Sequence, residues 1–353
     1  MSSVAIVRGI RSEIQTKLLP VTNRYWRSQL QFGIEAYSLR SFQSAAGNAR
    51  TTAVKPRTGL RRCERLFAND ALADQLGHVF DSLELIRPGS YVNVDHSDMN
   101  GLSALVGAIQ TRNGRAIPCL VETTYSDRLP SHTNAPARKQ ALRRARAKER
   151  RYTSFTGHYI DALQGLHDRL GFWPKLIFDR GFGNESLVTH LAAEGATFYL
   201  RLKGGRCVHL DGQRIETKHL SETDVAIQLF GLTLRVIRSP KSRRAREPWY
   251  ILTNDMTASR SKIVRIYYHR FEIEETFKDM KHVFELKRTR LNKPLSLKLL
   301  LWFVSLGIAL LYRATKPTKQ YTARQHPKKQ ISWIRRGYEE LQQAYGLLLW
   351  GMG

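Results

Sequence analysis

Apolar and polar residues follow two different periodicities along the chain, and the change falls near Ser90. Over residues 1–86 the apolar positions recur at helical spacing, and the run TGLRRCERLFANDALADQLGHVF predicts two short helices. The side chains expected to face inward there are Leu66, Phe67, Leu72, Leu76, Val79 and Phe80. After Ser90 the period becomes two: YVNVD (91–95) alternates as a half-buried strand does.

A hairpin signal follows this first strand. The stretches ALVGAIQT and RAIPCLVETT stand on either side of RNG, and the pair Asn113-Gly114 is typical of a tight hairpin turn. Residues 90–124 therefore predict three strands in meander order.

Helical and strand patterns alternate over the next part of the chain. An amphipathic helix is predicted near 154–170, and WPKLIFD (173–179) predicts a short buried strand that stops at the turn DRGFGN. A helix near 185–194 and the strands ATFYLRLK, GLTLRVIRS and WYILTND lead to a long helix over about 259–285. A meander, a helix and a strand ending in Asp is the chain order of a ribonuclease-H-like core, so we predict an α/β fold of that kind.

The longest apolar run is LLLWFVSLGIALLY, Leu299 to Tyr312. It is shorter than the ~20 residues that a membrane span needs, so it predicts a buried core helix. The N-terminus has no apolar segment of the secretory kind, and Cys63, Cys119 and Cys207 form no metal-binding or disulfide pattern. A reducing, cytoplasmic location and the absence of a membrane partner are expected.

Charge changes the picture of the partner. The 353 residues include 57 Lys and Arg against 30 Asp and Glu, a net charge of +27, while 42% of the chain is hydrophobic. The chain is therefore a folded protein with a large positive excess, and a polyanion such as DNA explains that excess best. An acidic small-molecule substrate would need only a local basic pocket.

Two Asp residues stand at predicted strand ends. Asp95 ends the first strand and Asp179 ends the fourth, and in an α/β sheet chemistry gathers at the carboxyl ends of strands. Neighbouring carboxylates repel each other unless they hold a cation, and Mg²⁺ prefers such hard oxygen ligands. Each Asp by itself also fits a plain turn residue, and Asp98 is a rival to Asp95.

A third carboxylate lies on the predicted long helix. At ~100° per residue, one narrow arc holds Tyr267, Arg270, Glu274, Lys278 and Lys281. The neighbouring arc holds the apolar residues Ile263, Ile266, Ile273, Phe277, Met280 and Phe284. The spacing alone favours a solvated face joined by i,i+4 pairs such as Glu274 with Lys278.

The motifs resemble a known family. Tyr267, Arg270, Glu274 and Lys281 match Y-x2-R-x3-E-x6-K, the signature of one group of DDE transposases of bacterial insertion sequences, the insertion-sequence-four family. NVDHSD looks like the first Asp box of that family, FDRGF like the second, and WYILTND like its last insertion strand. The boxes occur in the family's order over roughly residues 55–310.

This resemblance implies roles for the matching residues. Asp95, Asp179 and Glu274 would be catalytic metal ligands for Mg²⁺, with Mn²⁺ as a substitute. The DNA-contacting residues near the cut would be Tyr267, Arg270, Lys278 and Lys281. The implied activity is cleavage at the ends of an insertion sequence and transfer of the 3′-hydroxyls into target DNA, by two-metal-ion phosphoryl transfer and with a hairpin as one route. A homodimer on double-stranded DNA, in a bacterial nucleoid, is the implied setting.

The resemblance also divides the chain into parts. The expected parts are a helical N-terminal region for DNA-end binding (1–86), the first part of the core (87–196), a mostly β insertion (197–253), the rest of the core with the signature helix (254–312), and a basic helical C-terminal region (313–353). A plain helical bundle is the alternative for the first of these.

Two further features are candidate DNA contacts. The run 138–151 carries eight Lys and Arg, among them Arg143, Arg144 and Arg146, and is either a DNA-tracking helix or a solvated basic loop. Trp249 is either a buried sheet residue or a platform for an unpaired base. Two other functions remain open: a nuclease of the same fold without strand transfer, and a non-catalytic DNA-binding protein derived from a transposase.

Overall fold

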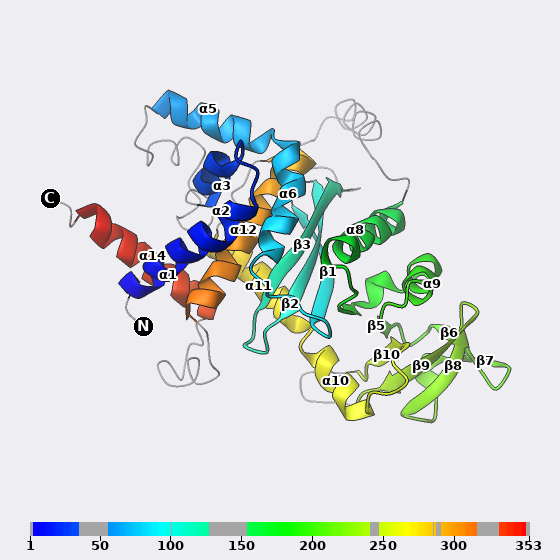
Figure 1. The fold of residues 1–353 in the computed structure, drawn as a ribbon. Coiled ribbons are helices and arrows are strands. Elements are labelled where there is room, and N and C mark those ends of the chain that lie inside the picture. The colour runs from blue at the N-terminus through cyan, green and yellow to red at the C-terminus, as the bar shows by residue number, and fades with distance from the viewer. Residues whose placement is uncertain are drawn as a thin grey trace, which may run out of the picture.

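The structure is a computed structural model. It describes residues 3–34, 56–99, 101–126, 154–240, 247–284, 286, 291–315 and 332–350. Helices from both ends of the chain pack together on one side of a large sheet, and the far end of that sheet carries only short strands and α10 (Figure 1).

Ten strands form one mixed sheet in the order β3-β2-β1-β4-β5-β10-β9-β8-β6-β7. Their bounds are β1 Tyr91–Met99, β2 Leu102–Gln110, β3 Ala116–Tyr125, β4 Lys175–Phe178, β5 Phe198–Leu202, β6 Cys207–Leu210, β7 Gln213–Glu216, β8 Asp224–Leu229, β9 Leu232–Arg238 and β10 Tyr250–Thr253. The predicted meander is confirmed, because β2 pairs antiparallel with both β1 and β3.

Strand β4 adds to β1 in parallel, and β5 adds to β4 in parallel. The order β3-β2-β1-β4-β5 with these directions agrees with the predicted ribonuclease-H-like core. In the register of β1 with β4, Val94 pairs with Phe178, so Asp95 and Asp179 are the next residues of two adjacent parallel strands. The sheet thereby brings the carboxylates of Asp95 and Asp179 together.

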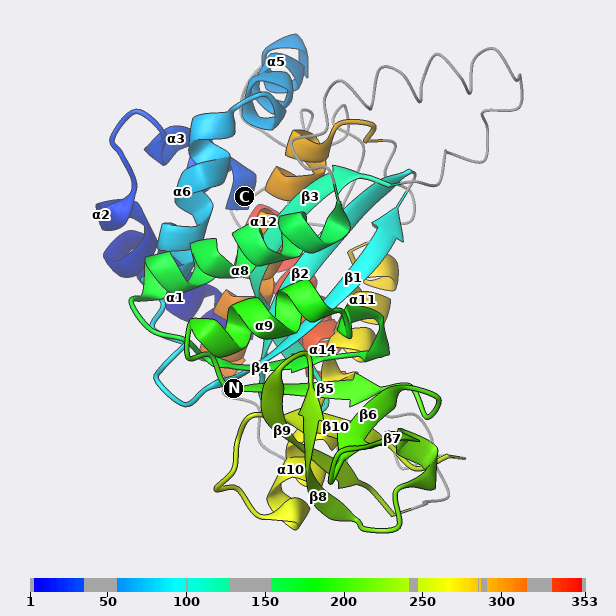
Figure 2. The ribbon, with the colours of Figure 1, turned by 90° about the vertical axis from the view of Figure 1, so that its right-hand side faces the viewer.

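Helices cover both faces of this core. In Figures 1 and 2, α8 (Phe155–Leu170) and α9 (Glu185–Ala193) lie on one face, and α11 (Phe271–His282) and α12 (Pro294–Thr315) lie on the other. The remaining helical elements are α1 Ser3–Glu13, a π-helical turn Ile14–Leu18, α2 Leu19–Val21, α3 Arg27–Gly33, α5 Pro56–Phe67, α6 Asp70–Asp81, α10 Arg260–Tyr268, α14 Trp333–Trp350 and the 3₁₀ turns Arg180–Phe182 and Thr217–His219.

Helix α12 is the centre around which the helices of both chain ends pack. Helices α1, α5, α6 and α14 all contact it, and every side chain from Leu299 to Leu311 is buried. By length and composition α12 could cross a membrane, but 83% of its most apolar window is buried inside the protein. The prediction of a buried core helix is confirmed, although the helix is longer than the apolar run.

The long helix expected over about 259–285 is wrong in one respect, because it is two helices. Helix α10 ends at Tyr268 and α11 begins at Phe271. Side chains from the sheet bind backbone carbonyls at this break: Asn93 Nδ2 donates to His269 O (3.1 Å) and Gln110 Nε2 donates to Ile266 O (3.1 Å). The predicted apolar stripe still faces inward, with Phe277 only partly buried.

The contact of α3 with α12 gives a test of this packing. A Cβ added at Gly33 would lie 2.2 Å from Phe303 Cζ, an atom of a fully buried ring. We expect Gly33→Ala to lower the free energy of unfolding by about 1–3 kcal/mol, because an overpacked core must shift. Urea unfolding followed by circular dichroism measures the change.

Gly165→Ala is the matched control. Gly165 lies within α8 and has nothing within 4 Å of an added Cβ, so alanine there should raise stability by about 0.5–1 kcal/mol. Equal stability of Gly33→Ala and wild type would contradict the packing of α3 on α12.

Candidate active site

Asp95 and Asp179 lie beside each other at the neighbouring strands β1 and β4. The prediction that Asp95 ends its strand is wrong, because β1 continues to Met99 and its residues after Asp95 also pair with β2. Asp95 Oδ1 accepts a hydrogen bond from the backbone N–H of His96 (2.8 Å), and its side chain is 20% exposed. Asp179 directly follows β4 and precedes the 3₁₀ turn Arg180–Phe182. Its Oδ1 atom is buried and has no hydrogen-bond partner among the described residues.

Glu274 comes to the same place from the first turn of α11. Its Oε1 accepts from Arg270 Nη2 at 2.5 Å, and the second guanidinium nitrogen, Nη1, lies 3.7 Å from Asp95 Oδ2. Arg270 is buried, with its side chain 3% exposed. The guanidinium of Arg270 therefore joins the carboxylate of Asp95 on β1 to the carboxylate of Glu274 on α11.

The electrostatics show that all three carboxylates share this site. Burial raises the pKa of the Asp95 carboxyl above its ordinary value, and the negative charges of Asp179 and Glu274 raise it further. The His96 N–H and the Arg270 guanidinium act in the opposite direction. Like charges this close favour a bound cation, and Arg270 is the cation that the chain itself supplies.

The fit of a metal ion is partial in this arrangement. Among the described residues no group of three His, Cys, Asp or Glu side chains is placed to hold one metal ion. Asp95 and Asp179 nevertheless lie on adjacent strands, and the buried, unpartnered Oδ1 of Asp179 is a free hard ligand. Mg²⁺ commonly binds through one or two carboxylates plus substrate phosphates, and this donor set meets that requirement.

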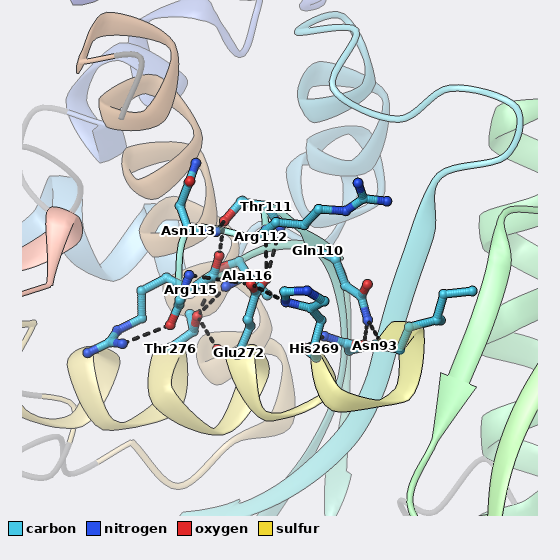
Figure 3. Close-up of polar contacts among 12 residues, drawn as sticks. Asn93, Gln110, Thr111, Arg112, Asn113, Arg115, Ala116, His269, Glu272 and Thr276 are labelled. Carbon is cyan, nitrogen blue, oxygen red and sulfur yellow. Dashed lines mark hydrogen bonds and ion pairs between the residues drawn. The ribbon is translucent and has the colours of Figure 1, made fainter. Parts of the chain in front are cut away.

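The signature helix is held against the sheet by Glu272, which the sequence analysis did not single out. Its buried carboxylate accepts the backbone N–H groups of Thr111 (3.0 Å), Arg112 (3.2 Å) and Gly114 (3.3 Å), all in the β2–β3 turn. His269 Nδ1 lies 3.1 Å from Glu272 Oε1. Figure 3 shows these contacts converging on Glu272 from the turn and from the start of α11.

Two more contacts extend this attachment along α11. Thr276 Oγ1 accepts from the Ala116 N–H (2.9 Å) and donates to its carbonyl (2.9 Å), at the start of β3. Arg115 Nε donates to Asp279 Oδ2 at 2.6 Å. The face of α11 that carries Glu272, Thr276 and Asp279 is therefore fixed on the meander, and Glu274 is left on the side toward Asp95.

The other signature residues have different environments. Tyr267 is fully buried under Arg270, whose guanidinium carbon lies 5.9 Å from the ring centroid, and burial raises the pKa of the Tyr267 hydroxyl. Lys278 is 64% exposed and pairs with Glu275 rather than with Glu274. Lys281 is partly buried one turn further along α11.

Trp249 lies inside the structure. It is 8% exposed and packs against Tyr267 (5.4 Å between ring centroids) and Phe271 (5.7 Å). This placement favours packing over base stacking, and the stacking role stays a prediction. Arg143, Arg144 and Arg146 lie outside the described residues, so their DNA contact also stays a prediction.

The site residues that the sequence analysis did not identify share one property: each has contacts with residues far away along the chain. Glu272 reads as one of several carboxylates on a charged helix face, and only its burial beside the β2–β3 turn distinguishes it. Tyr159 of α8 is a second such residue. Burial raises its pKa to about 12, and the charges of Asp98 and Asp95 add to this, so its hydroxyl lies near the same carboxylates.

Residues 153–311 match the sequence model of a family described as "Transposase DDE domain". The match supports a DDE transposase. The matched stretch includes Asp179 and Glu274 with the basic residues around it, whereas Asp95 precedes it.

Two other comparisons add little to this. The chain is similar to the piggyBac transposase in a cryo-EM synaptic complex with hairpin DNA, at 14% sequence identity, with a TM-score of 0.43, over 97% of this chain and 79% of that one. A likeness of this size is too weak to carry an argument. No curated protein matches the chain.

The attachment of the signature helix α11 to the sheet can be tested through Glu272. We expect Glu272→Ala to lower the free energy of unfolding by about 2–4 kcal/mol, because three backbone donors in the β2–β3 turn lose their acceptor. Glu272→Gln, which keeps one acceptor oxygen, should cost less. Chemical unfolding followed by tryptophan fluorescence measures both.

Glu275→Gln is the control on the same helix. Glu275 is 39% exposed and pairs with Lys278 and Arg115, so its loss should change stability by no more than about 1 kcal/mol. Equal effects of Glu272→Gln and Glu275→Gln would contradict the anchoring role.

Proposed function

We propose that this protein is a Mg²⁺-dependent DNA transposase of the insertion-sequence-four group. It cleaves the ends of an insertion sequence and joins the 3′-hydroxyls to target DNA. The observation that carries the proposal is the gathering of Asp95, Asp179 and Glu274 around the buried Arg270. The signature residues and the match to a transposase DDE domain support it.

In this proposal Asp95 on β1 and Asp179 after β4 hold the metal ions, and Glu274 on α11 is the third carboxylate ligand. When bound, two Mg²⁺ ions supply activation of the attacking oxygen and charge stabilisation of the leaving oxygen. Mn²⁺, also a hard cation, is expected to substitute. The pairing of Glu274 with Arg270 has to loosen for Glu274 to act as a ligand.

Arg270 then serves the DNA. Its Nε and Nη1 atoms are buried and have no hydrogen-bond partner among the described residues, so they are ready donors for phosphate oxygens near the cut. Lys281 and the exposed Lys278 continue the positive charge along α11. Tyr267 packs against the guanidinium and keeps it in place.

The remaining parts of the chain have proposed tasks in the same reaction. The helical region 1–86 binds the ends of the element, and two copies of the chain act together on DNA in the bacterial nucleoid. The strands of residues 197–253, β5 to β10, form the β insertion of the group, and β5 also continues the core sheet beside β4. Their continuity with the core sheet through the β5–β10 pairing supports a rigid placement beside the site.

The two other candidate functions differ from this one in their products. A nuclease of the same fold would release cleaved ends without joining them, and a non-catalytic binding protein would do neither. Incubation of the protein with terminal-repeat DNA, a second DNA and Mg²⁺ distinguishes the three when products are resolved by size. A hairpin on the element end would show as a third product, and Trp249→Ala should reduce it selectively if Trp249 receives an unpaired base.

The carboxylates themselves give the sharpest test of the activity. We expect Asp95→Ala, Asp179→Ala and Glu274→Ala each to abolish cleavage, while affinity for end DNA stays within about threefold, because phosphate contacts from Lys and Arg supply most of that affinity. Cleavage gels and fluorescence anisotropy on the same preparations measure the two properties.

Glu275→Ala is the matched control, since Glu275 is the next carboxylate on α11 and pairs with Lys278 and Arg115 instead of Arg270. It should cleave at close to the wild-type rate. If one of the three alanine variants still cleaved normally, that residue would leave the proposed site, and Asp98→Ala would be tested in place of Asp95→Ala.

A further inference from the structure

A cleft begins at the turn after Asp179 and runs toward the small strands of the sheet. Its volume is about 1100 Å³. The walls are the turn after Asp179, the end of β5, strands β6 and β7, and the β8–β9 turn. The cleft therefore lies between the core and the outer strands β6 to β9, which Figure 2 shows below the core.

The lining of this cleft carries positive charge only. The five Lys and Arg side chains are Arg180, Arg201, Lys203, Arg206 and Arg214. The lining contains no carboxylate, and none of the ion pairs among the described residues involves these five. Five cations without an ion-pair partner around one cleft repel one another unless an anion enters it.

The cleft adjoins the candidate active site through neighbouring residues of β4 and β5. In the parallel pairing of β4 with β5, Phe178 lies opposite Leu200, so Asp179 and Arg201 are the next residues of these two strands. Tyr267, the residue under Arg270, feels the charges of both Asp179 and Arg201. A chain of phosphates lying at the carboxylates could therefore continue into the cleft without a gap in positive charge.

An aromatic ring stands in the wall of the cleft. Phe230, half-buried at the β8–β9 turn, has Arg206 over its ring, with the guanidinium carbon 5.6 Å from the centroid. Arg206 also donates a hydrogen bond to Gly183 O, which ties the turn to the loop after Asp179. Phe230 has a φ of 56°, a left-handed conformation that a bulky aromatic rarely adopts. A hairpin turn by itself favours Asn or Gly at such a position.

We propose that this cleft binds a single-stranded stretch of DNA next to the cut, with its phosphates on Arg201, Lys203 and Arg214 and an unpaired base against Phe230. This inference rests on the proposed function for the identity of the nucleic acid. A duplex presents its phosphates outward and keeps its bases stacked inside, so it could use the cations but not the ring. The ring and the cations together match the way single strands are bound.

The test measures binding without catalysis. The full chain, in EDTA, is titrated into a short oligothymidine that carries one 2-aminopurine, and anisotropy and base fluorescence are recorded. Phe230→Asn removes the ring at a φ that Asn tolerates, so the turn itself is not strained. We expect Phe230→Asn to weaken binding about 5- to 150-fold, the equivalent of ~1–3 kcal/mol per stacked base, and to abolish the fluorescence change. Phe230→Tyr, which keeps the ring, should bind like wild type.

A second set of variants tests the charges. Arg201→Gln and Arg214→Gln should each reduce the slope of log K against log salt by about 0.7 on the single strand, whereas Arg87→Gln, an exposed arginine in the turn before β1, should not. Unchanged affinity in both Phe230→Asn and the arginine variants would overturn the proposal. Loss of duplex binding alone, with Phe230→Asn unaffected on the single strand, would overturn it in favour of a duplex groove.

These outcomes are separable from the failure of the proposed function. If the protein binds the single strand through Phe230 but cleaves no end DNA with Mg²⁺, the cleft proposal is supported and the proposed transposase activity is contradicted. If it cleaves and joins DNA while Phe230→Asn binds and cleaves normally, the activity stands and the cleft proposal falls.

Discussion

Three backbone N–H groups of the β2–β3 turn donate to the buried carboxylate of Glu272, and the geometry of the site depends on this contact. A helix lying on a sheet can slide or rotate unless polar contacts fix it. Here three contacts fix one face of α11 on the sheet. They are made by the Glu272 carboxylate, the Thr276 hydroxyl and the Arg115–Asp279 pair. Because side chains rotate ~100° per residue along a helix, the fixed face also fixes the direction of Glu274. Glu272, which has no role in the proposed chemistry, therefore sets how far Glu274 lies from Asp95 and Asp179.

The second constraint is the need to balance negative charge. Asp95, Asp179 and Glu274 converge in a partly buried place, where like charges are costly without a cation. Arg270 supplies this cation: its side chain is 3% exposed, and its guanidinium pairs with the carboxylates of Asp95 and Glu274. The same side chain is then placed for phosphate, with unused donors on Nε and Nη1. One residue thus pairs with two of the three carboxylates, and under the proposed function it would also contact the DNA backbone.

One continuous sheet connects the candidate active site with the outer strands. Strand β5 pairs with the core on one side and with β10 on the other, so the outer strands β6 to β9 are continuous with the strands that carry the Asp residues. The basic cleft lies at this junction, and its first wall is the turn after Asp179. Five of the 57 Lys and Arg residues of the chain line this cleft, where under the proposal a DNA strand would leave the carboxylates.

The meander, the buried helix of residues 299–311 and the placement of Asp95 and Asp179 on neighbouring strands followed from the sequence, whereas strands β6 to β8 and the continuation of β1 beyond Asp95 did not. Periodicity and turn chemistry are local properties that a single chain expresses directly. The break at His269, the anchoring by Glu272 and the use of Arg270 as a shared counter-ion were decided by tertiary structure. Each of these depends on atoms far apart in sequence, such as Asn93 Nδ2 with His269 O, and no local pattern encodes such a distance. The same reason explains Trp249 and Phe230. Sequence alone left Trp249 between a buried and a binding role, whereas the packing of Tyr267 and Phe271 buries it, and the sheet order puts Phe230, an unremarked turn residue, into the basic cleft.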